Sequence, residues 1–369
     1  MSAVRIATAD GHAVTVTSVG EAVPAWAERY FGAWWTATPV TDLAGPVVCG
    51  DVDEEELCAL TAVVDAASPE RIEYAGAEML FVRDDTMVTA VQPSEALAYR
   101  WDAQWQVLRI VGTDETVVAT AAARLAREIV RAQLLDDGWA ILHASAVTGQ
   151  DGATILTLGD KGAGKTTTAF TLGRVGWAML ANDRVFARVR ADGTVRVLPW
   201  PSAAAIGFGL LDALDLYEPV RERLASGEQM HPTQHQNVTD ALLAGSRTPL
   251  WKKNGKGELK PQFFPDQLTS WLSIPLATEG HAAGILYPQI TREAAPRLIE
   301  TSRGVQDGDF FDETTEDRYP DVFGLLPPPA DHTALRAALA ELPRQGLVMG
   351  HDTSVNATLL KDAVIRLNV

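Results

Sequence analysis

The stretch that decides the fold is Gly159-Asp160-Lys161-Gly162-Ala163-Gly164-Lys165-Thr166. It matches the pattern G-x-x-x-x-G-K-[ST], and it stands between an apolar run, Ala153–Leu158, and a helical segment that ends near Val175. Glycines in such a loop let backbone N–H groups turn inward toward phosphate oxygens, and the positive end of the following helix points at the same place. The stretch therefore predicts a phosphate-binding loop between a strand and a helix.

The residue types of this loop predict separate roles. Lys165 is expected to reach the β- and γ-phosphates of a nucleotide, and the Thr166 hydroxyl to ligate Mg²⁺. The other residues expected to bind the phosphates are Gly159, Asp160, Lys161, Gly162, Ala163, Gly164 and Thr167. ATP and Mg²⁺ are thus the expected cofactors, although the sequence leaves GTP or another donor open.

Asp183 is the acidic residue expected beside the loop. It follows a short apolar run, Trp177–Leu180, and lies 18 residues after Lys165. In a strand–loop–helix–strand unit this spacing brings the end of the last strand back to the loop. A carboxylate there can hold the metal or take a proton from an attacking hydroxyl.

His143 lies in an apolar run, Ala140–Val147, that predicts a single strand before the loop strand. A histidine alone in such a strand is usually a packed core residue, and position alone favours that interpretation over a functional one. The turn Gly149–Gly152 separates the run from Ala153–Leu158. Continuous apolar strands beside a helix predict a buried sheet with helices on its faces.

The rest of the pattern predicts the domain organisation. Residues 1–112 are expected to form a strand-rich α+β lobe, residues 113–138 a connecting helix capped by Thr113, and residues 139–369 a P-loop domain. Polar insertions are expected near 212–262 and 305–330, and a last helix near Thr333–Leu342. In the lobe, Ala98–Ile110 predicts one strand with Trp101 and Trp105 on one face.

Charge and composition restrict the partners. Acidic residues outnumber basic ones by 48 to 31 in 369 residues, which gives a net charge of −17. That field repels nucleic acid and anionic membranes. The two cysteines, the lack of a signal-peptide pattern and the lack of an apolar run of about 18 residues lead us to expect a cytoplasmic protein. Whether it forms a homo-oligomer is left open.

Three stretches together resemble the catalytic core of HPr kinase/phosphorylase: Leu142–Val147, Ile155–Thr166 and Gly176–Val185. They look closer still to the HPr-kinase-like kinases of bacterial biosynthetic clusters, a group that includes lasso-peptide kinases. The resemblance is sharp over Trp139–Val189, and none is visible in residues 1–110. It implies an α/β fold with a P-loop kinase core similar to the C-terminal domain of HPr kinase.

The resemblance also implies roles for individual residues. The histidine that matches His143 lies near the transferred phosphate in the family, so it joins Lys165 and Asp183 as an expected catalytic residue. The family carries two adjacent aspartates where this chain has Asn182 and Asp183. Asn182 can ligate the metal beside Thr166 and Asp183, but an amide cannot act as a base. The departure places the base role on Asp183 and weakens the case for reversible phosphorylase chemistry.

The expected activity is transfer of the γ-phosphate of ATP to a hydroxyl of a small molecule, such as a sugar, nucleoside or amino-acid-like biosynthetic intermediate. A serine of a peptide or protein is the alternative acceptor. A nucleotide-binding regulatory NTPase is a second alternative, but the chain lacks a guanine-reading motif and a transport-ATPase signature. The acceptor is expected on Pro199–Gly209 and Lys252–Phe264, and closure of Lys252 and Lys253 over the phosphates is left open.

Overall fold

The computed structural model describes residues 1–253, 255, 257–311 and 319–367, and it has a mixed α/β fold. Two compact units divide the chain. The first comprises Met1–Trp139 with the described residues 319–330, and the second comprises Ala140–Phe311 with residues 331–367. The helix expected to connect two domains, residues 113–138, belongs to the first unit, and so does the described end of the expected 305–330 insertion.

The first unit is built on one mixed sheet. The strand order within its described residues is β3 (Thr36–Pro39), β1 (Ser2–Ala7), β2 (Ala13–Ser18), β4 (Val47–Val52), β9 (Val107–Gly112), β8 (Leu97–Asp102), β7 (Met87–Gln92), β6 (Ala77–Arg83) and β5 (Glu70–Tyr74). Strand β4 pairs in parallel with β2 and β9, whereas the other neighbours are antiparallel.

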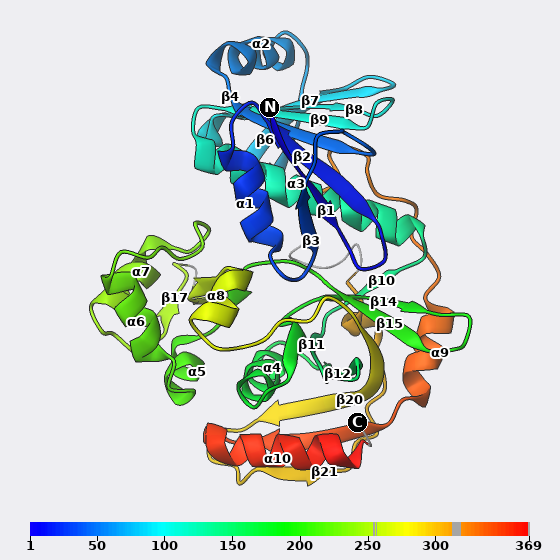
Figure 1. Cartoon of the computed structure of the whole chain (residues 1–369), viewed down its shortest axis with the longest axis vertical. Coiled ribbons are helices and arrows are strands. Elements are labelled where there is room, and N and C mark those ends of the chain that lie inside the picture. The colour runs from blue at the N-terminus through cyan, green and yellow to red at the C-terminus, as the bar shows by residue number, and fades with distance from the viewer. Residues whose placement is uncertain (254, 256, 312–318, 368–369) are drawn as a thin grey trace. The chain divides into compact units, whose positions relative to one another are not determined.

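Helices cover both faces of this sheet (Figure 1). Helices α1 (Ala22–Phe31) and α3 (Glu115–Asp136) pack on one face, where a Cβ at Gly50 of β4 would lie 3.1 Å from Val118 and 3.3 Å from Val23. Helix α2 (Glu54–Asp65) packs on the other face through Leu60 and Val64. A 3₁₀ turn, η1 (Pro93–Glu95), joins β7 to β8.

The expectation of one strand over Ala98–Ile110 is wrong, because the chain turns back on itself as the β8–β9 hairpin. The Asp102 carboxylate accepts hydrogen bonds from the backbone N–H groups of Gln104 and Trp105, which holds the turn. Trp105 is therefore 70% exposed at the tip, while Trp101 is buried in β8. The two indoles do not share a strand face.

The second unit is also built on a mixed sheet. The strand order within its described residues is β10 (Ala140–Leu142), β14 (Val185–Val189), β15 (Val195–Pro199), β20 (Gly280–Ile290), β12 (Ala153–Thr157), β11 (Ser145–Thr148) and β13 (Ala178–Ala181). Strand β22 (Arg344–Met349) also pairs with β20, in parallel, and with β21 (Arg297–Ile299). Two small sheets pair β16 (Ala204–Ala205) with β19 (Gln262–Phe263) and β17 (Leu250–Trp251) with β18 (Glu258–Leu259).

Helices lie on both faces of this second sheet, as the apolar strands predict. Helix α4 (Lys165–Arg174) packs on one face and against α10 (Thr353–Arg366), while Leu335 and Leu339 of α9 (Thr333–Glu341) join the core of the other face (Figure 1). The smaller helices are α5 (Phe208–Ala213), α6 (Tyr217–Ala225), α7 (Gln236–Leu243), α8 (Pro265–Ser270) and the 3₁₀ turn η2 (Asp307–Asp309), and of these α6 and α7 lie within the 212–262 insertion. Helix α9 is not the last helix, because α10 follows β22.

The expectation of one strand over Ala140–Val147 is also wrong. The run breaks at His143 and Ala144 into β10 and β11, which pair with different strands of the sheet. The break is held from outside the run, because the His143 backbone N–H donates to the carbonyl oxygen of Asp309 at 2.7 Å. His143 is therefore at a strand junction and not within a strand.

The start of α3 generates a prediction about stability. The Asp114 carboxylate, and not Thr113, caps the helix by accepting from the Val117 N–H at 2.9 Å. Asp114→Ala should lower the free energy of unfolding by about 1 kcal/mol. Thr113→Ala should change it by less than about 0.5 kcal/mol. Urea denaturation of both variants checks this, and equal losses would contradict the assignment of the cap.

Candidate functional site

The candidate site lies at one edge of the second sheet. Strand β11 pairs antiparallel with β12 on one side and β13 on the other, so β12 and β13 run in the same direction. Their carboxyl ends therefore open at the same edge, where the glycine-rich loop follows β12 and Asp183 follows β13. The start of β11 lies at this edge too, because Ser145 is opposite Thr157, and this places His143 there.

Glycine is needed in the loop for two different reasons. Gly159, Gly162 and Gly164 have φ angles of 148°, 86° and 118°, in the region that side chains rarely adopt. At Gly164 the space is filled as well, because a Cβ would lie 2.9 Å from Ile290 and 3.0 Å from Met349. At Gly162 a Cβ would meet no atom within 4 Å. The loop is thus packed against β20 and β22 at Gly164 and open at Gly162.

Lys165 begins α4 and folds back onto the loop. Its ammonium donates to the carbonyl oxygens of Gly159 at 2.6 Å and Asp160 at 3.3 Å, and its own carbonyl accepts from Ser145 Oγ at 2.8 Å. Burial lowers the pKa of Lys165, and the charges of Asp183, Asp309 and Asp160 oppose that change. The ammonium therefore stands in a partly desolvated site where an anion would be held strongly.

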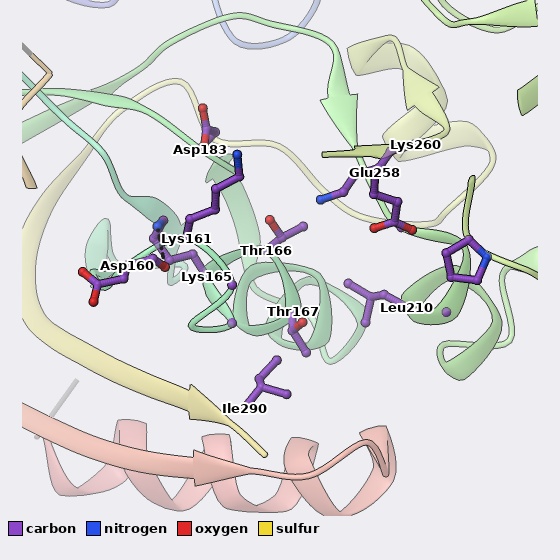
Figure 2. Close-up of a pocket in the computed structure, with 15 residues that line it drawn as sticks. Asp160, Lys161, Lys165, Thr166, Thr167, Asp183, Leu210, Glu258, Lys260 and Ile290 are labelled. Atoms are coloured by element: carbon purple, nitrogen blue, oxygen red, sulfur yellow. Dashed lines mark hydrogen bonds between the residues drawn. The ribbon is translucent and has the colours of Figure 1, made fainter. Parts of the chain in front are cut away.

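The loop and Asp183 line one cavity of about 460 Å³ (Figure 2). The side chains of Lys165, Thr166 and Thr167 face it from the loop and α4, and Asp183 faces it from the end of β13. The Asp183 side chain is 49% exposed and lies 3.4 Å from the Arg184 Nε. A hydroxyl, a carboxylate and an ammonium therefore face the same space, which is the donor set that a magnesium–phosphate ligand requires.

The opposite wall comes from the two segments expected to bind the acceptor. Gly207 and Gly209 belong to the first segment, with Leu210 directly after it, and Glu258 and Lys260 belong to the second. Of the described lysines in the second segment, Lys260 is the one that lines the cavity. Lys252 and Lys253 are exposed and do not line it, and Lys256 lies outside the residues that the structure describes.

Four expected site residues do not line the cavity. Gly159 and Ala163 belong to the loop itself, and the other two are Asn182 and His143. Asn182 is 7% exposed, so its amide is buried beside β13 and does not face the cavity with Asp183. His143 is half-buried, and its ring lies edge-on to Phe311 with centroids 5.5 Å apart. The structure thus brings the loop, Thr166, Thr167 and Asp183 to one cavity, and it leaves His143 and Asn182 out of the lining.

A buried ion pair near Lys165 escaped the sequence analysis. Asp309 is 2% exposed, and both of its carboxylate oxygens accept from the Arg303 guanidinium, at 2.8 and 3.0 Å. The guanidinium also lies 4.8 Å from the ring centre of Tyr287. The residues around Asp309 are rich in aspartate and glutamate, and such a composition predicts an exposed loop. No local pattern in the sequence therefore indicates that Asp309 is buried.

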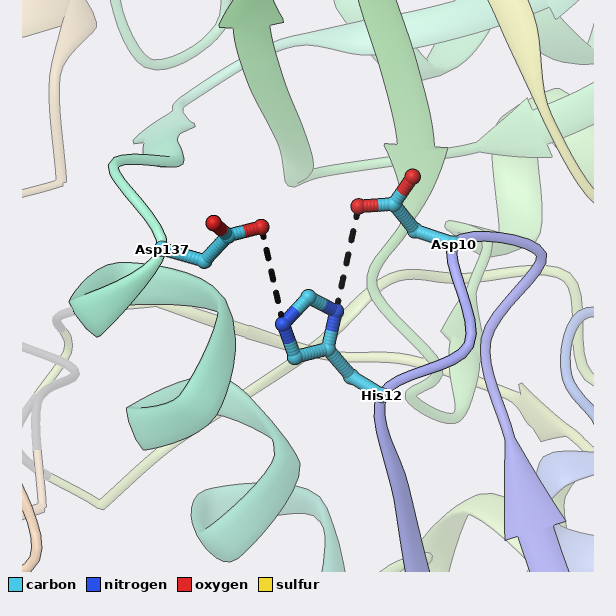
Figure 3. A group of neighbouring side chains, drawn as sticks. All are labelled: Asp10, His12 and Asp137. Carbon is cyan, nitrogen blue, oxygen red and sulfur yellow. Dashed lines mark ion pairs between the residues drawn. The ribbon is translucent and has the colours of Figure 1, made fainter.

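Metal-ligating side chains also gather in the first unit, around His12 (Figure 3). Among the described residues this is the one such group of three, and it combines Asp10, His12 and Asp137. His12 Nδ1 lies 3.8 Å from Asp10, and Nε2 lies 3.6 Å from Asp137. A metal ion would bind one ring nitrogen, whereas here each nitrogen faces a different carboxylate. Each ring nitrogen thus lies within ion-pair distance of a carboxylate.

Comparisons with protein-family models and with curated proteins find no match for this chain. Within the described part of the chain, no helix combines the length and apolar character needed to cross a bilayer. Cys49 and Cys58 are free thiols.

The two glycine environments generate a prediction for the loop. Gly162→Ala adds only backbone strain, whereas Gly164→Ala also forces a methyl group against Ile290 and Met349. Gly164→Ala should therefore lower the free energy of unfolding by about 1–3 kcal/mol more than Gly162→Ala. Chemical denaturation of the two variants measures the difference. Equal losses would mean that the loop is not packed against β20 and β22.

Proposed function

We propose that the protein is a cytoplasmic kinase that transfers the γ-phosphate of ATP to a hydroxyl of a small-molecule biosynthetic intermediate, with a P-loop core of the HPr-kinase-like type. The observation that carries this proposal is that Lys165, Thr166 and Asp183 line one cavity. A loop that only binds phosphate, without catalysing a reaction, would not need the carboxylate of Asp183 in the same cavity. A cavity of about 460 Å³ also lies in the range for small-molecule sites.

The residues divide the work as follows. The loop amides and Lys165 hold the β- and γ-phosphates, and Thr166 and Asp183 hold Mg²⁺, which neutralises charge on the phosphate oxygens. The acceptor oxygen forms a bond to the γ-phosphorus while the bond to the β–γ bridging oxygen breaks, and ADP leaves. Asp183 accepts the proton of the acceptor hydroxyl.

Fewer residues are assigned to catalysis and metal binding than the sequence predicts. His143 and Asn182 do not line the cavity, so we assign the transfer to Asp183 and Lys165 and the metal to Thr166 and Asp183. The buried Asp309–Arg303 pair holds the junction of β10 and β11, because the Asp309 backbone carbonyl also accepts from the His143 N–H.

Two alternatives use the same cavity. A peptide serine would have to approach a chain of net charge −17, which disfavours acidic peptides. A regulatory NTPase would transfer the phosphate to water, and it would then need no room for an acceptor in the cavity. Incubation with γ-labelled ATP and separate pools of metabolites and peptides, followed by identification of the labelled product, distinguishes the three.

Replacement of the proposed base tests the mechanism. Asp183→Asn should lower the rate of transfer by about 10²–10⁴-fold while ATP still binds, because the amide cannot accept the proton. Lys165→Ala should abolish transfer, and Asp362→Asn, an exposed aspartate of α10, is the matched control that should leave it unchanged. Transfer retained by Lys165→Ala would contradict the loop assignment. Loss of ATP affinity in Asp183→Asn would make Asp183 chiefly a metal ligand.

Because the pKa of Lys165 is lowered, we expect ATP binding to be coupled to proton uptake. Burial holds this pKa below 10.5 in the free protein, and phosphate oxygens beside the ammonium raise it again. In alkaline solution, as the pH approaches 10.5, ATP binding should therefore take up protons, and the uptake should diminish as the pH is lowered and more of Lys165 is charged before binding. Titration calorimetry in buffers of different ionisation heat measures the uptake. Lys165→Met should remove it, and equal uptake in the variant would contradict the prediction.

A further inference from the structure

The two ends of the cavity are not equivalent, because the loop fixes which end would receive the terminal phosphate of a nucleotide. The loop lysine reaches the β- and γ-phosphates, whereas the loop backbone holds the α- and β-phosphates. Figure 2 shows the Lys165 ammonium and Asp183 together on one side of Thr166. Thr167, Leu210 and Ile290 lie on the other side. A nucleotide held by the loop would therefore direct its nucleoside toward Leu210 and Ile290.

The nucleoside end of the cavity is apolar except for one charged group. Leu210 and Ile290 present aliphatic side chains there, which suit the face of a base. Glu258 projects its carboxylate to the same end, away from Asp183 (Figure 2). A carboxylate is repelled by phosphates, so its natural partner in a nucleotide is a hydroxyl or an amine.

Glu258 is placed to receive such a partner. Its carboxylate makes no hydrogen bond or ion pair with any residue that the structure describes. It also lies against Gly207, where a Cβ would be 3.0 Å from both carboxylate oxygens. Gly207 has a φ of −69°, which any residue can adopt, so its backbone does not require glycine. The lack of a side chain at Gly207 instead makes room for the carboxylate.

We propose that this end of the cavity binds the ribose of the nucleoside triphosphate, with the Glu258 carboxylate accepting hydrogen bonds from the 2′- and 3′-hydroxyls. Two carboxylate oxygens match a pair of adjacent hydroxyls, and an acidic residue takes the same part in dinucleotide-binding folds. The inference rests on the proposed nucleotide site and adds a selectivity to it. The protein selects ribonucleotides over deoxyribonucleotides.

Lys260 has a different role on the same wall. It lies two residues after Glu258, and Figure 2 shows its ammonium pointing toward the side of Lys165 and Asp183. It therefore faces the phosphates and not the ribose. A change at Lys260 should weaken ribonucleotides and deoxyribonucleotides alike, which makes it the internal comparison for Glu258.

The test measures the dissociation constants of Mg-ATP, 2′-deoxy-ATP and 3′-deoxy-ATP by calorimetry with the full chain. The unaltered protein should bind ATP about tenfold more tightly than either deoxy analogue, because each lacks a hydroxyl that bonds to a charged acceptor. Glu258→Ala should abolish the preference, so that the three nucleotides bind alike, because ATP loses two hydrogen bonds and each analogue loses the one that it keeps. Continued binding of all three shows that the variant is folded. Lys260→Met should weaken all three and keep their ratio.

A second glutamate, outside the cavity, provides the matched control. Glu222→Ala removes an exposed glutamate of α6 and should leave all three constants unchanged. Equal binding of ATP and its deoxy analogues, or a ratio that survives Glu258→Ala, would overturn the ribose assignment while leaving the kinase proposal intact. Selective ATP binding without transfer to any acceptor would overturn the kinase proposal alone. Failure of every nucleotide to bind would overturn both.

Discussion

The candidate site depends on the position of β11, which lies antiparallel between β12 and β13. In a simple βαβ unit the two parallel strands would be neighbours, and the groups at their ends would crowd together. Here one strand separates them, so the ends of β12 and β13 are about 10 Å apart across the sheet. This separation leaves room for a phosphate and its metal between the loop and Asp183. Strand β11 therefore separates the loop from Asp183, in addition to its contribution to the core.

The charges of the cavity are arranged against the net charge of the chain. Among the described residues that line it, Lys161, Lys165 and Lys260 match Asp160, Asp183 and Glu258 in number. The cavity wall is thus neutral in a protein of net charge −17. Exposed charges beyond about 8 Å are largely screened at physiological ionic strength. A polyanion inside the cavity would respond mainly to the near cations and the N-terminus of α4, and the acidic surface would discourage larger polyanions from approaching.

Local sequence signals predicted the parts of the site that are local in the chain. The loop and the start of α4 lie within a few residues of one another, so one motif specifies both. His143 was placed in a strand because its neighbours are apolar, yet the break there is made by a carbonyl at Asp309, far along the chain. The sequence shows that acidic residues are frequent around Asp309 and that several lysines precede Lys260. It does not show that Arg303 pairs with Asp309 or that Glu258 lies beside Gly207, because those contacts arise only when distant segments fold together.

Because Asn182 is a buried amide, Asp183 is the one carboxylate that the end of β13 brings to the cavity. Under the proposed mechanism this residue must both ligate the metal and accept a proton, and a metal ion lowers the basicity of its carboxylate. Forward transfer tolerates this conflict, because the attacking oxygen in a loose transition state keeps its proton until late and needs only a weak base. Attack by inorganic phosphate in the reverse sense places a further anion beside the same carboxylate, with no second group to share the charge or the proton. Under the proposed mechanism, transfer would therefore run in one direction.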